Sequence, residues 1–106
     1  MSSLNTFTRP ARRATLVPVN EKEYVAQLKL EGFAHTYVWE DGPNTRYPDH
    51  THGEETAHII LEGEMKVGMA GKSNTYRVGD RFNVPANAVH CAVMGPRGCK
   101  YIVGER

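Results

Sequence analysis

Short stretches rich in β-branched and aromatic residues, separated by turn residues, run along most of the chain. Val, Ile, Tyr and Thr favour strands, whereas Gly, Pro, Asn and Asp between such stretches mark turns. The pattern predicts strands at 14–19, 24–30, 33–40, 57–62, 64–69, 75–78, 81–84, 88–94 and 99–103. Many short strands at regular spacing are typical of a sandwich or barrel. We therefore expect one all-β domain over 14–106, preceded by an N-terminal arm at 1–13.

Two segments near the N-terminus need separate comment. Asn20 could cap a helix over 20–28, with Glu21 and Glu23 in its first turn, but the alternation of polar and apolar residues over 27–30 favours a strand. The apolar segment 14–19 contains Pro18, which suits an edge strand. Such a strand could lie along the sheet of a second copy or cover its own sheet.

Composition excludes several classes of function. With 106 residues the chain has room for one domain, and a formal net charge of +1 provides no field that would attract nucleic acid or an anionic membrane. The basic cluster of Arg9, Arg12 and Arg13 is predicted to be a solvated tail. No run reaches the roughly 18 apolar residues of a membrane helix, and the N-terminus lacks the apolar core of a secretory signal. We expect a cytoplasmic protein in which Cys91 and Cys99 are reduced thiols.

Three histidines form a candidate metal site. His50 and His52 share one face if their segment is extended, and His90 can join them if the chain folds back between. Imidazole is the commonest side-chain ligand for transition metals. A polar pocket without metal is the alternative. Cys91 directly follows His90 and should point to the opposite face, and His35, with no motif around it, is expected at the surface or at an edge.

Two segments resemble the consensus motifs of the cupin superfamily. They read PDHTH at 48–52 followed by IILEGE at 59–64, and GDRFNVPANAVH at 79–90. In the second motif Gly79, Pro85 and His90 keep the family spacing, and Asn87 takes the usual glycine position. The resemblance implies a double-stranded β-helix, also called a jelly-roll barrel, and a homodimer. It also implies a metal held by His50, His52 and His90.

The first motif departs from the family at one ligand. Cupins usually place a metal-ligating Glu where this chain has Thr56. Glu55 is one residue early and faces the wrong way unless the loop is remodelled, whereas His58 shares the face of Thr56. We expect His58 either as a fourth metal ligand, with a possible role in moving a proton, or as a pocket residue bonded to a neighbour.

The donor set and the pocket wall narrow the chemistry. Three or four nitrogen donors suit iron, copper, nickel or zinc better than manganese. Tyr37, Trp39 and Phe82 are predicted to line the pocket with apolar surface, which suits a small organic substrate. Glu55 and Thr56 are also expected to be pocket residues. No carboxylate pair, nucleophile beside a base or phosphate loop is present.

We expect a metal-dependent cupin enzyme, with oxygen-dependent cleavage or oxidation placed ahead of isomerisation, cyclisation or decarboxylation. The alternative is a non-catalytic module that binds a small ligand or a metal.

Overall fold

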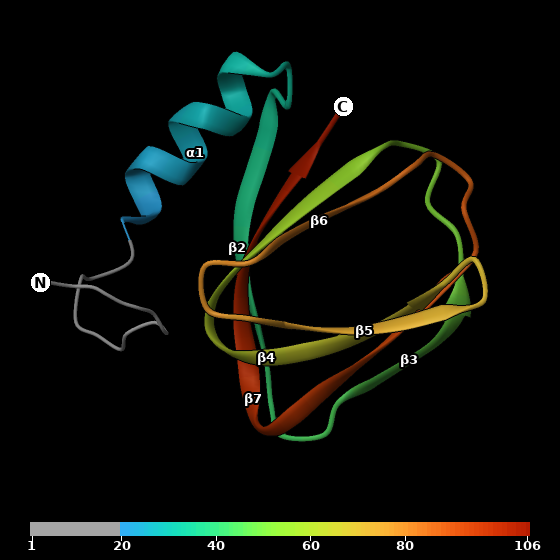
Figure 1. The fold of residues 1–106 in the computed structure, drawn as a ribbon. Coiled ribbons are helices and arrows are strands. Elements are labelled where there is room, and N and C mark those ends of the chain that lie inside the picture. Colours follow the sequence, from blue (N-terminus) through green and yellow to red (C-terminus); the bar gives the residue numbers. More distant parts are fainter. Residues whose placement is uncertain (1–19) are drawn as a thin grey trace, which may run out of the picture.

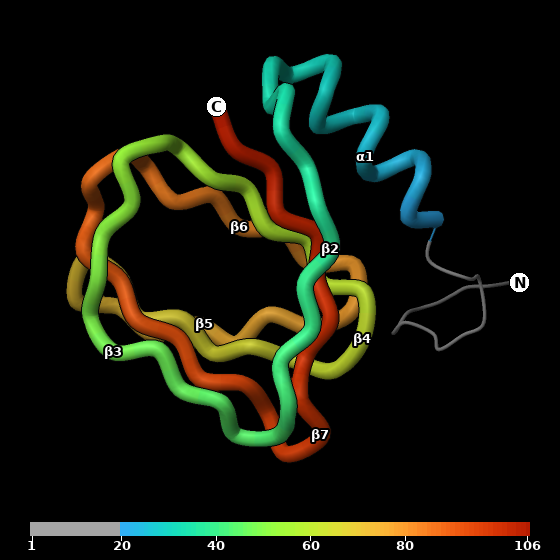
Figure 2. The backbone as a smooth tube through the Cα atoms, turned by 180° about the vertical axis from the view of Figure 1, so that it is seen from behind, coloured from blue at the N-terminus to red at the C-terminus, as the bar shows by residue number. Residues whose placement is uncertain are grey.

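One helix and six strands form the part of the protein that the computed structural model describes, residues 20–106. The arm at 1–13 and the predicted strand at 14–19 lie outside the described residues. The elements are α1 (Glu21–Leu30), β2 (His35–Asp41), β3 (Arg46–His50), β4 (Thr56–Met69), β5 (Lys72–Arg77), β6 (Arg81–Val84) and β7 (His90–Glu105). The strands curl around a central space, and α1 packs outside them (Figures 1 and 2). The expected all-β barrel is confirmed.

Two long strands organise the sheet, and all pairings are antiparallel. β7 pairs with β2, β3 and β4, while β4 also pairs with β5 and β6. In this register His90 lies opposite His50 of β3 and opposite Met69 of β4. The chain therefore folds back as the candidate metal site requires.

The strand predicted at 24–30 is wrong, because this segment belongs to helix α1. Asn20 caps the helix, and its side chain accepts a hydrogen bond from the Glu23 N–H at 3.1 Å. Leu28 is fully buried but Leu30 is 84% exposed, so the two leucines do not share a face as they would in a strand. Among residues 20–106, no helix is long and apolar enough to cross a membrane.

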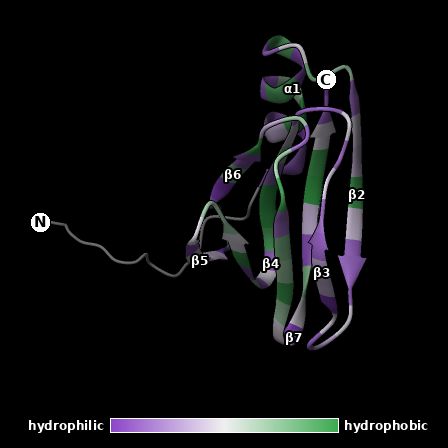
Figure 3. Ribbon diagram, turned by 90° about the vertical axis from the view of Figure 1, so that its right-hand side faces the viewer, coloured by the Kyte–Doolittle hydropathy of each residue, from purple (hydrophilic) through white to green (hydrophobic). Residues whose placement is uncertain are grey.

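The sheet has an apolar core on each side, which explains the continuous apolar run at 57–61. Side chains of one parity, such as Ile60, point into the barrel, and those of the other parity, such as Ile59 and Ile102, pack under α1 with Leu28 and Phe33. Figure 3 shows apolar residues along β4 and β7, where both cores meet the sheet. The inner core leaves room for a cavity.

The strand boundaries differ most from the prediction at three places. The stretches at 57–62 and 64–69 are one strand, β4, in which Gly63 adopts φ of +75° and the register with β7 shifts. The stretches at 88–94 and 99–103 likewise join as β7. β3 was not predicted, because it is short and contains Pro48. It pairs with β7 and brings His50, and His52 shortly after it, to the barrel wall.

Candidate metal centre

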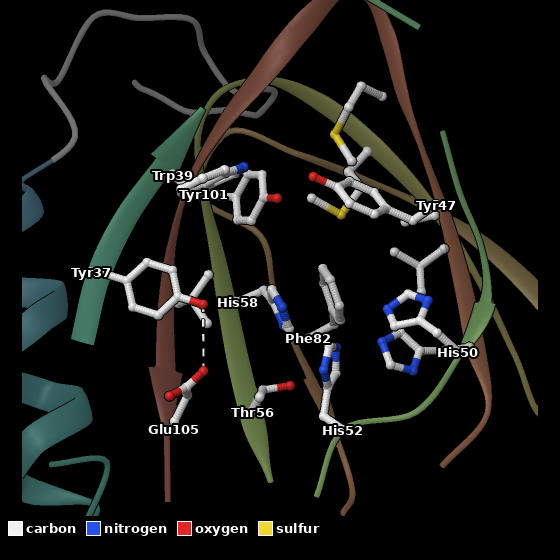
Figure 4. A pocket seen from close by; sticks show the side chains of 16 residues that line it. Tyr37, Trp39, Tyr47, His50, His52, Thr56, His58, Phe82, Tyr101 and Glu105 are labelled. Atoms are coloured by element: carbon white, nitrogen blue, oxygen red, sulfur yellow. Dashed lines mark hydrogen bonds between the residues drawn. The ribbon is translucent and has the colours of Figure 1, made fainter. Parts of the chain in front are cut away.

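A cavity of about 370 Å³ lies inside the barrel and is lined mainly by apolar and aromatic side chains. His50, His52, His58 and His90 all reach it, as do the predicted pocket residues Tyr37, Trp39, Thr56 and Phe82. Figure 4 shows His50 and His52 on one side of this space and Tyr37 and Trp39 on the other.

His50, His52 and His90 converge on one point at the cavity wall. Each offers a ring nitrogen that lies within 4.8 Å of the other two. The ring centroids are 4.8 Å apart for His50 and His52, 4.2 Å for His50 and His90, and 5.0 Å for His52 and His90. His90 is buried, His50 is partly buried and His52 is exposed, so the group borders both the core and solvent. We call these three residues the triad.

Backbone carbonyls orient two of the three rings. The Nδ1 atom of His50 lies 2.7 Å from the Pro48 carbonyl oxygen, and that of His90 lies 3.0 Å from the Ala88 carbonyl oxygen. Because a carbonyl only accepts, Nδ1 must carry the proton in both rings. The lone pair is then left on Nε2, the arrangement found in metal-ligating histidines whose other nitrogen is held by an outer partner.

A turn in the second motif joins the two halves of the triad. Asn87 has φ of +67°, a left-handed conformation that asparagine tolerates better than most residues, and its N–H donates to the His52 carbonyl oxygen at 2.7 Å. This bond fastens the loop after β3 to the turn before β7. The left-handed conformation explains why this position usually holds glycine and why asparagine can replace it here.

The surroundings of His52 also favour its uncharged form, which metal binding needs. The pKa of His52 is lowered, first by burial and then by the nearby His90 and His50 rings. A neutral imidazole keeps its lone pair, so three such rings fit a divalent transition metal.

His58 faces the cavity, as strand parity predicted, but its ring lies outside the group of close nitrogens. It stacks on Phe82 of β6 with centroids 4.5 Å apart and planes 4° from parallel. This stacking fixes the ring of His58 against Phe82, and the fourth-ligand role stays a prediction. Burial, and then the charges of His90 and His52, lower the pKa of His58 to about 3.

Two buried polar atoms of cavity-lining residues have no hydrogen-bond partner among the described residues. They are His58 Nδ1 and Thr56 Oγ1. Such atoms are costly in a core, and in native proteins they often mark a place where a ligand or water binds. The expected hydrogen bond from His58 to a protein neighbour is therefore missing at Nδ1.

Glu55, expected as a pocket residue, does not line the cavity. Its carboxylate accepts from Arg106 Nε at 2.9 Å, and its backbone pairs with that of Arg106. The pocket carboxylate is instead Glu105, whose Oε2 accepts from the Tyr37 hydroxyl at 3.4 Å and whose Oε1 lies 2.9 Å from His35 Nδ1. Side chains alternate along β7, so Glu105 lies on the same face as Tyr101 and Val103, and this alternation could have identified it. His35 is exposed, as predicted.

Asp41 is a second residue that the sequence analysis missed. It accepts hydrogen bonds from Trp39 Nε1 at 3.1 Å, from the Tyr47 hydroxyl at 2.8 Å and from the Tyr101 hydroxyl at 2.7 Å. All three donors line the cavity. Its position in a predicted turn gave no signal of this role.

A comparison with known families identifies the family to which this barrel belongs. The cupin domain family model matches residues 37–103. The chain belongs to the cupin domain family. The match covers the barrel strands and both motifs, and a search of curated proteins finds no match.

Solved cupin structures provide further comparisons. The DMSP lyase DddQ from Ruegeria pomeroyi DSS-3 is 28% identical, covers 67% of this chain and 36% of its own, and has a TM-score of 0.62. An RmlC-like cupin from Shewanella frigidimarina NCIMB 400 is 26% identical, covers 66% of this chain and 62% of its own, and has a TM-score of 0.60. This cupin therefore spans about a third of the length of the lyase that it matches.

Proposed function

We propose that this cupin is a metal-dependent enzyme that performs lyase or isomerase chemistry on a small organic molecule in its cavity. The observation that carries the proposal is the triad, whose His50 and His90 rings are oriented with Nε2 free and which opens onto a mainly apolar cavity. Such a pocket with few polar groups is the usual form of a small-molecule site.

The triad would hold iron, copper, nickel or zinc through three neutral imidazoles. When bound, such an ion acts as a Lewis acid on an oxygen atom of the substrate. Because Thr56 replaces the usual glutamate, the imidazoles leave the double positive charge of the ion uncompensated. This charge favours a substrate with an anionic oxygen, such as a carboxylate or an enolate.

His58 is proposed as the proton acceptor. Its Nδ1 is unpartnered among the described residues, its ring faces the cavity, and its low pKa keeps it neutral at physiological pH. A group with so low a pKa is a weak base in the free protein, but an anionic substrate beside it would raise the pKa toward the range of a useful base. Thr56 Oγ1 can hydrogen-bond the same substrate.

The similarity to a DMSP lyase favours non-oxidative chemistry over the oxygen-dependent reaction that the sequence analysis placed first. Oxidation stays the second candidate, because a three-histidine site with open positions also suits oxygen chemistry. Homodimer formation and a cytoplasmic location stay predictions, and light scattering coupled to gel filtration tests the first.

Metal analysis tests the proposal. Protein purified without an affinity tag is measured by inductively coupled plasma mass spectrometry together with His90→Ala and, as a matched control, His35→Ala. We expect near-stoichiometric metal in wild type and in His35→Ala and its loss in His90→Ala. No metal in wild type, even after reconstitution, would overturn the enzyme proposal and leave a ligand-binding barrel.

A second experiment separates an enzyme from a binding module. His58→Gln should keep the metal but lose most turnover, measured first on DMSP and then on a panel of small carboxylic acids. A metal-loaded wild type that turns over none of them but binds them would favour the non-catalytic alternative.

A further inference from the structure

Four aromatic side chains line the cavity beyond the triad: Tyr37, Trp39, Tyr47 and Tyr101. We call them the aromatic wall. In Figure 4, Trp39 and Tyr101 lie together, Tyr47 faces them across the cavity, and Tyr37 lies below Trp39 on the same side. The wall comes from β2, β3 and β7, so it is formed where these neighbouring strands meet.

Every polar atom of the aromatic wall points at a carboxylate. Trp39, Tyr47 and Tyr101 donate to Asp41 at distances of 2.7 to 3.1 Å, and Tyr37 donates to Glu105 at 3.4 Å. The polar atoms of the wall are therefore occupied, and its aromatic rings remain to contact a ligand. A hydroxyl or indole N–H that donates to an anion leaves more electron density on its ring, which strengthens the negative face of the ring.

The charges around the cavity have one sign. No Lys or Arg is among the cavity-lining residues that the structure describes, whereas Glu105 lines the cavity and Asp41 lies directly behind the wall. Before any metal binds, this pocket is electrostatically negative and has apolar surfaces.

We propose that the aromatic wall binds an onium group, that is, a quaternary ammonium or a sulfonium, of a small ligand. Cation–π attraction to electron-rich rings and the two carboxylates supply the recognition. A methylated cation fits better than a primary ammonium, because Asp41 already accepts three hydrogen bonds and Glu105 accepts two contacts. An onium has no N–H that needs a partner, and its methyl groups suit Met65 and Met94 in the same cavity.

The proposal also deepens the proposed function. If the triad holds a metal that attracts an anionic oxygen, the complete ligand is zwitterionic, with its negative end at the triad and its onium at the aromatic wall. That second half rests on the proposed function, whereas onium binding to metal-free protein does not.

A pair of isosteric probes tests the charge requirement. Choline and 3,3-dimethyl-1-butanol have the same shape but differ in the positive charge, and Trp39 is the single tryptophan of the chain, so its fluorescence reports on the wall directly. Titrations use protein freed of metal with a chelator. We expect a saturable change for choline with an affinity at least about tenfold higher than for the neutral alcohol. Equal affinities, or no saturable change with choline, would overturn the proposal.

Variants locate the binding. Asp41→Asn should weaken choline binding several-fold, whereas Glu62→Gln should not, because it removes an exposed carboxylate that pairs with Lys100 at 3.8 Å. If Asp41→Asn does not fold, Tyr37→Leu at the cavity mouth serves in its place and should show the same loss. Unchanged binding in the folded wall variant would overturn the assignment.

One more variant keeps the two proposals apart. His90→Ala should lose metal and keep choline binding, since the aromatic wall does not include the triad. If wild type binds choline but no metal, the proposed enzyme function fails alone; if it binds metal but not choline, the onium site fails alone.

Discussion

The buried His58 makes this cupin sensitive to acid, by an amount that can be worked out. In the folded protein its pKa is lowered to about 3, chiefly by burial, whereas in the unfolded chain it returns to its ordinary value of 6.5. Between pH 6.5 and about pH 3, the unfolded state therefore binds a proton at His58 and the folded state does not. The stability that comes from a neutral His58 is complete above pH 6.5 and is lost progressively as the pH falls toward 3.

The linkage relation converts this difference into a free energy of unfolding. Between pH 8 and pH 5 the two pKa values predict that His58 alone removes about 2 kcal/mol of stability. That is a substantial part of the roughly 5–15 kcal/mol that holds a typical domain folded.

Urea unfolding of metal-free protein at both pH values measures the effect. His58→Gln removes the titrating group, so the variant should lose about 2 kcal/mol less than wild type on acidification. His35→Gln, which removes an exposed imidazole, serves as the control and should follow wild type. Parallel losses in wild type and His58→Gln would refute the reasoning, because they would show that His58 titrates alike in both states.

Three further predictions concern the backbone and the thiols. Gly63→Ala should cost at least about 3 kcal/mol in urea unfolding, because its Cβ would strike the Gly98 carbonyl oxygen, whereas Gly71→Ala, also at positive φ but in open space, should cost only about 1 kcal/mol. Similar losses in the two would contradict this. Asn20→Ala should cost about 1 kcal/mol through loss of the helix cap, and an unchanged urea midpoint would show that α1 does not need it. Burial raises the pKa of Cys99 to about 12, so iodoacetamide at pH 8 should alkylate the partly exposed Cys91 first; peptide mass spectrometry showing equal rates would count against the buried site.

The triad could be predicted because its information is local. His50 and His52 share a face through strand periodicity, and His90 sits at a fixed distance from Gly79 and Pro85 in a motif that also fixes the turn. The orientation of the His58 side chain into the cavity likewise follows from the alternation of side chains along β4, because His58 lies two residues after Thr56. The faces of His50, His52 and His58 need only the period of a strand, whereas the place of His90 rested on the resemblance to the second cupin motif.

The missed features depend on which distant segments meet. Helix and strand fit the segment at 24–30 equally well until the outer face of the sheet is known, because that face buries Leu28 and leaves Leu30 in solvent. Asp41 reads as a turn residue, and only the pairing of β2 with β7 brings Tyr101 to it. Glu55 was assigned to the pocket because it lies next to the position of the missing glutamate, and its pairing with the distant Arg106 could not be seen in the sequence.

The bonds that orient His50 and His90 each come from a carbonyl two residues earlier in the same segment. No side chain from elsewhere in the protein is needed to hold these two rings in the tautomer that a metal requires. Substitutions in the cavity wall can therefore accumulate without disturbing the two imidazoles. A barrel built this way can change its ligand over evolutionary time while these two imidazoles keep the orientation that metal binding needs.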